Sequence, residues 1–156
     1  MNKRSTMEAP SVPDGRLFGL LLCVLTVVLF TISPLALVQF GFNYDDAGGN
    51  PFEKIHPATP IAAAIVLLAA IASGNPISWF IEHCGRHPVL IFYLGAIALL
   101  VLHSIRVVSL PFTHFFDTFL LPALIFLLFK DISDARARTL AWIIHLLMIT
   151  NALIGI

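Results

Sequence analysis

Long stretches without any charged residue constrain the fold of this chain more than any other feature. From residue 17 to residue 40 no Asp, Glu, Lys or Arg occurs, and further apolar stretches follow down to the last residue. An α-helix needs about 20 consecutive apolar residues to cross the hydrocarbon core of a bilayer. Charged residues make up only 12% of the chain, against about 25% in a usual soluble domain. We therefore predict an integral membrane protein.

The apolar stretches predict an all-α fold, namely a polytopic bundle of about five transmembrane helices. Pro34 is expected to kink the first helix, and the second is expected to start with Thr59 as its cap and Pro60 in its first turn. Residues 1–15 are polar and predict a disordered cytoplasmic tail, which leaves residues 16–156 as the helical domain. The expected spans are residues 17–40, 59–73, 88–109, 111–129 and 139–156.

The positions of Lys and Arg predict how the helices are oriented. Short cytoplasmic loops collect these residues. The N-terminal tail and the loops after the second and fourth spans hold most of them, namely Lys3, Arg4, Arg16, Arg86, Lys130, Arg136 and Arg138. The N-terminus is therefore expected in the cytoplasm, and residues 41–58 and 110–113 are expected outside. The net charge is zero, and the absence of a basic patch argues against a nucleic-acid partner.

Two pairs of polar residues are expected near the outer ends of the third and fourth spans. His103 and Arg106 are three residues apart, as are His114 and Asp117, so each pair shares a helical face. A short turn between the spans would bring the two faces together. An Arg inside a span costs about 3 kcal/mol and usually has a partner. Arg106 and Asp117 are candidates either for a salt bridge that joins two helices, or for a phosphate site with a His that exchanges protons.

The loop at residues 43–60, NYDDAGGNPFEKIHPATP, supplies five more candidate site residues. Asp45 and Asp46 precede Ala-Gly-Gly and suit a turn. Glu53, Lys54 and His56 are too mixed in charge for a calcium site. An acid of this loop could act as a general base only in a partly buried site that raises its pKa.

The cytoplasmic segment at residues 75–88, NPISWFIEHCGRHP, predicts a short helix at the membrane interface. Asn75 is expected to cap this helix and Gly85 to end it. Its large apolar side chains, with Trp79 among them, are expected against the lipid headgroups. Its two histidines are four residues apart, but no further Cys or His completes a zinc site. We therefore expect no metal.

The order of these features resembles a known family. In sequence order the chain contains PLALVQFGFNYDDAGGNPFEKIHPATP, SLPFTHFFDTFLLPAL and FKDISDARARTLAWIIHLLMITNALIGI. These segments resemble the N-terminal part of bacterial polysaccharide polymerases and O-antigen ligases, and within that superfamily they look most like the VpsF-like exopolysaccharide-biosynthesis branch. The similarity covers nearly all of residues 17–156, and its most specific parts are GGNPFEKIHPAT and HFFDTFLLP.

The resemblance implies a multi-pass glycosyltransferase of the bacterial inner membrane that works at the periplasmic face. Such enzymes transfer a glycan from undecaprenyl diphosphate to another glycan or to lipid A core, without a metal or cofactor. Arg106 would stabilise the diphosphate leaving group, with Asp117 as its partner. Family members are much longer, and their periplasmic loop with essential Arg and His residues does not occur in this chain. These residues are therefore expected to be the front part of a longer domain and to be inactive alone.

Two other function classes stay open. A non-enzymatic accessory or assembly protein of the membrane would use Arg106 and Asp117 only to join helices. A small transporter would need inverted repeats, and Pro34 and Pro122 do not lie in matching halves. The double change Arg106→Asp with Asp117→Arg is expected to restore a structural ion pair but not a phosphate site. The oligomeric state is left open.

Overall fold

The fold of the chain is all-α, as predicted. The computed structural model describes residues 15–39, 41, 54–107 and 115–154, without the side chains of residues 34–36 and 105–107. These residues form seven α-helices and one π-helical turn, η2. The elements are α1 (Arg16–Thr31), α2 (Pro34–Gln39), α3 (Ala58–Ala72), α4 (Pro76–Arg86), α5 (Pro88–Val107), η2 (Phe116–Leu120), α7 (Leu121–Phe129) and α8 (Asp134–Ile154).

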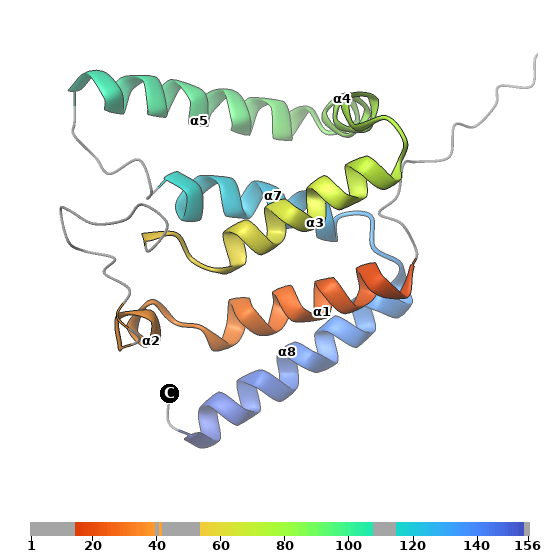
Figure 1. The fold of residues 1–156 in the computed structure, drawn as a ribbon, viewed down its shortest axis with the longest axis vertical. Coiled ribbons are helices and arrows are strands. Elements are labelled where there is room, and N and C mark those ends of the chain that lie inside the picture. Colours follow the sequence, from red (N-terminus) through yellow and green to blue (C-terminus); the bar gives the residue numbers. More distant parts are fainter. Residues whose placement is uncertain (1–14, 40, 42–53, 108–114, 155–156) are drawn as a thin grey trace, which may run out of the picture.

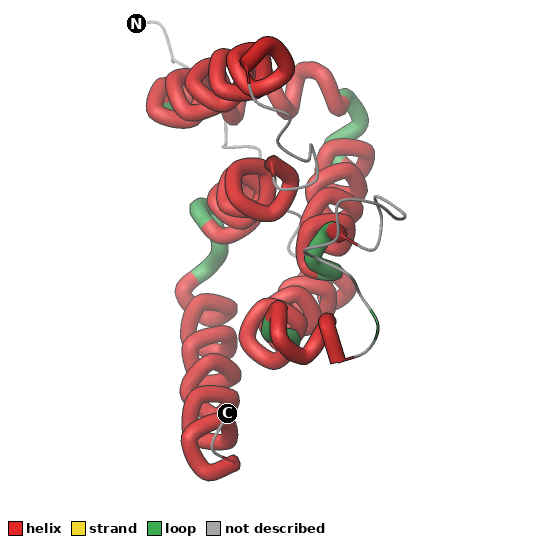
Figure 2. Tube along the Cα trace, turned by 90° about the vertical axis from the view of Figure 1, so that its left-hand side faces the viewer, coloured by secondary structure: helices red, strands yellow, loops and turns green. Residues whose placement is uncertain are grey.

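The long helices lie side by side, with α8 at one edge of the bundle and α5 at the other (Figure 1). α8 packs on α1, α1 on α3, and α3 on α7, and a view from the side shows the same neighbours (Figure 2). The main core lies between α1, α3 and α7, where Leu22, Leu25, Ile65 and Leu128 are fully buried. Close packing of these side chains makes these three helices the centre of the described bundle.

The first and last helices run parallel to each other. Arg136 Nη2 donates to Gly15 O at 3.1 Å near the start of both helices, and Asn151 Nδ2 donates to Phe30 O at 3.2 Å near their ends. The two residues of each pair are 121 positions apart in the sequence, so the two helices keep the same alignment from one end of their contact to the other. We call the end of the bundle where α1 and α8 begin the Arg16 end. We call the end where α1 stops and α3 begins the His56 end.

The predicted first span is divided into two helices. α1 ends at Thr31, Ile32 is extended with φ −94° and ψ 98°, and α2 begins at Pro34. Proline cannot donate a backbone hydrogen bond, and it disfavours the helical conformation in the residue before it. The expectation of a kink in one continuous helix was therefore wrong, because Pro34 begins a new helix.

The described part of the fourth predicted span contains a change of helix type, and the fifth predicted span begins earlier than expected. Residues Phe116–Leu120 form a π-helical turn before α7. This wider turn suits the position before Pro122, because proline has no N–H to donate to the preceding turn. Tyr93 Oη donates to Phe119 O in this turn at 3.0 Å and so ties α5 to it. α8 begins at Asp134 and not at residue 139. An acid in the first turn favours the earlier start, because it complements the helix dipole.

Among the described residues, no single helix has both the length and the apolar composition needed to cross a membrane. α3 and α4 meet this requirement only together, as a pair bent by 109°. α1, residues Pro88–Ser104 of α5 and residues Phe116–Phe129 are apolar but shorter.

Candidate functional site

A pocket lies at the His56 end, where three helix termini meet. α1 stops there, α3 begins there, and η2 begins beside them. The pocket has a volume of about 470 Å³ and is lined by Leu29, Phe30, Ile32, Ser33, His56, Asp117 and Leu121. We call it the His56–Asp117 pocket. Its walls combine apolar side chains from α1 and α7 with polar groups from the helix termini, as is usual for small-molecule sites.

Asp117 holds the start of α3 in place from a distant part of the chain. Its Oδ2 accepts a hydrogen bond from the His56 backbone N–H at 2.7 Å, and its Oδ1 accepts one from Thr59 Oγ1 at 2.5 Å. Negative charge near the start of a helix is favoured by the helix dipole. Each hydrogen bond to a charged group contributes about 1.5–3 kcal/mol. Asp117 therefore fixes the start of α3 against η2.

The His56 ring joins the end of α1 to the start of α3. Its Nε2 lies 2.8 Å from Ile32 O, and its Nδ1 lies 3.1 Å from the Ala58 N–H. A carbonyl can only accept and an amide N–H can only donate, so Nε2 carries the proton and Nδ1 accepts. Both ring nitrogens are therefore engaged. Proton exchange with a ligand would first require one of these two hydrogen bonds to break.

The structure brings together two of the predicted site residues, His56 and Asp117. His103 is exposed on α5, and Lys54 lies two residues before His56. Arg106 belongs to the last turn of α5, but its side chain is not described, so its predicted pairing with Asp117 lies outside the described part. Outside it as well lie Asp45, Asp46, Glu53 and His114.

The role of Thr59 differs from the one that the sequence predicts. We expected this residue to cap α3, but Pro57 occupies the cap position and Thr59 is buried in the first turn. Its hydroxyl donates to Asp117, which is 58 residues away in the sequence. No local pattern indicates such a contact, because it depends on how α3 and η2 meet.

The helix at the opposite end of the bundle, α4, begins as predicted. The Asn75 side chain accepts a hydrogen bond from the Ser78 N–H at 3.1 Å, and Pro76 occupies the first turn. The helix then continues through Gly85 to Arg86. The expectation that Gly85 ends the helix was therefore wrong. Glycine is only a weak helix breaker, and the next proline, at position 88, is where α5 begins.

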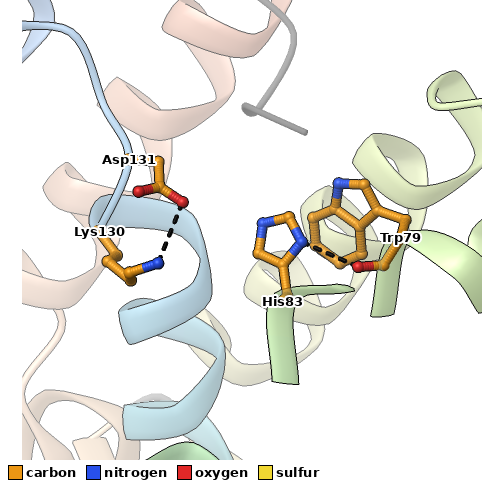
Figure 3. Close-up of polar contacts among 4 residues, drawn as sticks. All are labelled: Trp79, His83, Lys130 and Asp131. Atoms are coloured by element: carbon orange, nitrogen blue, oxygen red, sulfur yellow. Dashed lines mark hydrogen bonds and ion pairs between the residues drawn. The ribbon is translucent and has the colours of Figure 1, made fainter. Parts of the chain in front are cut away.

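The polar groups around α4 serve packing (Figure 3). Trp79 is only 2% exposed and stacks on His83, with ring centroids 4.0 Å apart. Trp79 therefore lies in the core, and its predicted place against the headgroups was wrong. His83 Nδ1 donates to Trp79 O at 2.9 Å, and Lys130 pairs with Asp131 at 3.3 Å. Burial raises the pKa of the Cys84 thiol, which favours its protonated form.

No set of three or more His, Cys, Asp or Glu side chains that could hold a metal ion occurs in the part of the chain that the structure describes. No protein-family model, curated protein or solved structure matches this chain. Fold and site together define an all-α bundle with a mostly apolar pocket, which also holds His56 and Asp117, at the junction of three helix termini. The resemblance to polysaccharide polymerases and O-antigen ligases rests on the sequence segments alone.

Proposed function

We propose that this chain is a multi-pass protein of the bacterial inner membrane with a role in polysaccharide biosynthesis. The observation that carries the membrane assignment is the set of large apolar side chains exposed on every long helix. Leu20 on α1 is 61% exposed, Phe92 on α5 is 79% exposed, and Trp142 on α8 is 71% exposed. Soluble proteins rarely expose contiguous apolar patches of more than a few hundred Å². Lipid acyl chains are the environment that such a surface fits.

In this proposal five segments cross the bilayer, namely α1 with α2, α3, α5, η2 with α7, and α8. Helices shorter than about 20 residues are accommodated when the bilayer thins locally. The positive-inside rule places the Arg16 end in the cytoplasm and the His56–Asp117 pocket at the periplasmic face. The basic residues that support this orientation are Arg16, Arg86, Lys130, Arg136 and Arg138, all near the Arg16 end.

We propose further that the His56–Asp117 pocket is part of a groove for an undecaprenyl-diphosphate-linked glycan. Leu29, Phe30 and Leu121 offer an apolar wall that suits an isoprenoid chain. Ser33 and Asp117 offer oxygens that suit sugar hydroxyls. Arg106, in the last turn of α5, would bind the diphosphate through charge-assisted hydrogen bonds. The family that the sequence resembles polymerises or ligates such glycans, and we assign this chain a share in binding, with no group assigned to catalysis.

A second candidate function is a non-enzymatic accessory or assembly protein of the same membrane. The observation that favours it is the use of polar atoms in the pocket. Both carboxylate oxygens of Asp117 and both ring nitrogens of His56 hold helix termini together. In this alternative the pocket is a structural junction, and exposed loops bind the partner protein.

Binding of undecaprenyl diphosphate to the full chain in lipid nanodiscs separates the two functions. We expect Arg106→Gln to weaken binding at least about tenfold, because a charge-assisted contact contributes about 1.5–3 kcal/mol. Arg86→Gln is the matched control, since it removes an exposed Arg from the Arg16 end, and we expect no change. Absence of binding, or an equal loss in both variants, would overturn the phosphate role and favour the accessory function.

The charge swap between Arg106 and Asp117 is a weaker test. The Asp117→Arg change would remove the acceptor of two hydrogen bonds at the start of α3. The double variant is therefore expected to be unstable whether or not Arg106 binds a phosphate.

A further inference from the structure

α8 has two opposite faces, and only one of them is covered by the described helices. The covered face packs on α1 and includes Leu140, which is buried, and Ile143, which packs against the main core. Arg136 and Asn151 make their hydrogen bonds to α1 from the same face. The opposite face is exposed along its whole length and carries Arg138, Trp142, His145, Ile149 and Ala152.

The exposed residues of α8 follow a regular spacing. Successive members are four, three, four and three residues apart, which is the spacing of the a and d positions of a heptad repeat. A stripe of this kind fits a second helix that crosses at about 20°. A hollow of about 210 Å³, lined by Arg138, Ala141, Trp142 and His145, lies on the stripe and offers a hole for a side chain of that second helix. We call this surface the Trp142 stripe.

The polar groups of the Trp142 stripe complement each other. His145 Nδ1 lies 3.0 Å from Ala141 O and must donate to it, because a carbonyl only accepts. Nε2 of the neutral ring is then left as an acceptor. The indole N–H of Trp142, one turn away, is only a donor, and no hydrogen bond to it occurs within the described residues. In two parallel copies related by a twofold axis, each Trp142 can donate to the partner's His145.

Two charged side chains complement each other in the same way one turn earlier on α8. Asp134 and Arg138 are both exposed and are four residues apart. Arg138 belongs to the stripe, and Asp134 precedes it by one turn on the same side of α8. A twofold axis brings a surface against itself, so a surface that pairs with its own copy must carry matching opposite groups. Asp134 beside the stripe and Arg138 on it form an acid–base set, and one turn later Trp142 and His145 form a donor–acceptor set.

We propose that two copies of this chain form a parallel dimer through the Trp142 stripe of α8. The proposal goes beyond the proposed function and does not depend on what the His56–Asp117 pocket binds. In a membrane an unpaired Arg or His on a lipid-facing surface is costly, and interhelical hydrogen bonds offset that cost. The second copy is the partner for which the stripe itself supplies every complementary group.

Disulfide cross-linking in native membranes tests the dimer. Cys23 and Cys84 are the two cysteines of the chain and would first be replaced by Ser. In that background Ile149→Cys, on the stripe, is compared with Met148→Cys. These residues are 55% and 61% exposed and differ in direction by about 100°. We expect several-fold more covalent dimer from Ile149→Cys. Equal yields, no dimer, or a product with another protein would overturn the proposal.

A second variant tests the hydrogen bond without a cysteine. Trp142→Phe keeps an aromatic ring but removes the donor, and we expect the dimer dissociation constant in detergent to rise about threefold. Leu146→Ala, an exposed change off the stripe, is the control and should leave the constant unchanged. An unchanged constant in Trp142→Phe would overturn the pairing as assigned. A dimer that does not bind undecaprenyl diphosphate would overturn only the proposed function.

Discussion

At the scale of single residues, Asp117 shows how one carboxylate joins distant segments of a chain. Its partners His56 and Thr59 are 61 and 58 residues away in the sequence. The sequence analysis could identify Asp117 as important, because a charged residue in an apolar stretch needs a reason to be there. It could not identify the start of α3 as the partner. That contact follows from the packing of α3 on α7, and no local pattern in the sequence indicates this packing.

Two replacements of Asp117 are expected to lower the free energy of unfolding by different amounts. Asp117→Asn keeps one acceptor, and its amide can donate to the Thr59 hydroxyl, so we expect a loss of about 1–2 kcal/mol as the charge disappears. Asp117→Ala leaves the His56 N–H without its acceptor, and we expect a loss of about 3 kcal/mol. The free energy of unfolding in detergent, followed by fluorescence of the buried Trp79, measures both. Equal losses in the two variants would contradict the hydrogen-bond assignment.

At the scale of elements, the elbow between α3 and α4 follows rules that can be read from the sequence. Gly74 has φ +82°, a conformation that L side chains rarely adopt, and Asn75 and Pro76 then start α4. The start of α4 could be predicted for this reason. The division of the first span at Pro34 was predicted only as a kink, because proline disfavours helix locally, but its surroundings decide whether the helix resumes in the same direction.

Replacement by alanine is expected to lower the free energy of unfolding at Gly74 and to raise it at Gly85. Gly74→Ala should cost about 1–2 kcal/mol, because alanine is strained at this positive φ. Gly85→Ala should add about 0.5–1 kcal/mol, because Gly85 lies inside α4 with open space around it. The same unfolding measurement in detergent compares them. A loss of stability in both variants would show that α4 does not continue through Gly85.

At the scale of the whole molecule, the all-α class could be predicted from the long apolar stretches. A backbone in an apolar environment must form its hydrogen bonds internally, and a helix does so within one segment. Most basic residues of the described part lie at the Arg16 end, whereas Lys54 and Arg106 lie at the other end. The order of the helices could not be predicted in this way. Which apolar faces meet depends on the shapes of side chains such as Leu22, Ile65 and Leu128, not on their hydrophobicity.

The proposed orientation can be measured with two exposed positions at opposite ends of the bundle, Thr118 and Ser133. In a background with Cys23 and Cys84 replaced by Ser, we expect a membrane-impermeant maleimide to label Thr118→Cys in intact spheroplasts. Ser133→Cys should react only after the membrane is disrupted. The reverse pattern would place the Arg16 end outside, and labelling of both positions, or of neither, in intact spheroplasts would contradict the proposed spanning arrangement.

The parallel contact between α1 and α8 also determines when the bundle can be completed during translation. α1 leaves the ribosome before α8, and the residues of α8 that contact it are made 121 positions later. At ordinary rates of synthesis this delay is about 10 s. Throughout that time the surface of α1 around Gly19 and Cys23, which α8 finally covers, is open to lipid, chaperones and proteases. This surface of α1 therefore gains its protection from α8 only after α8 has been made.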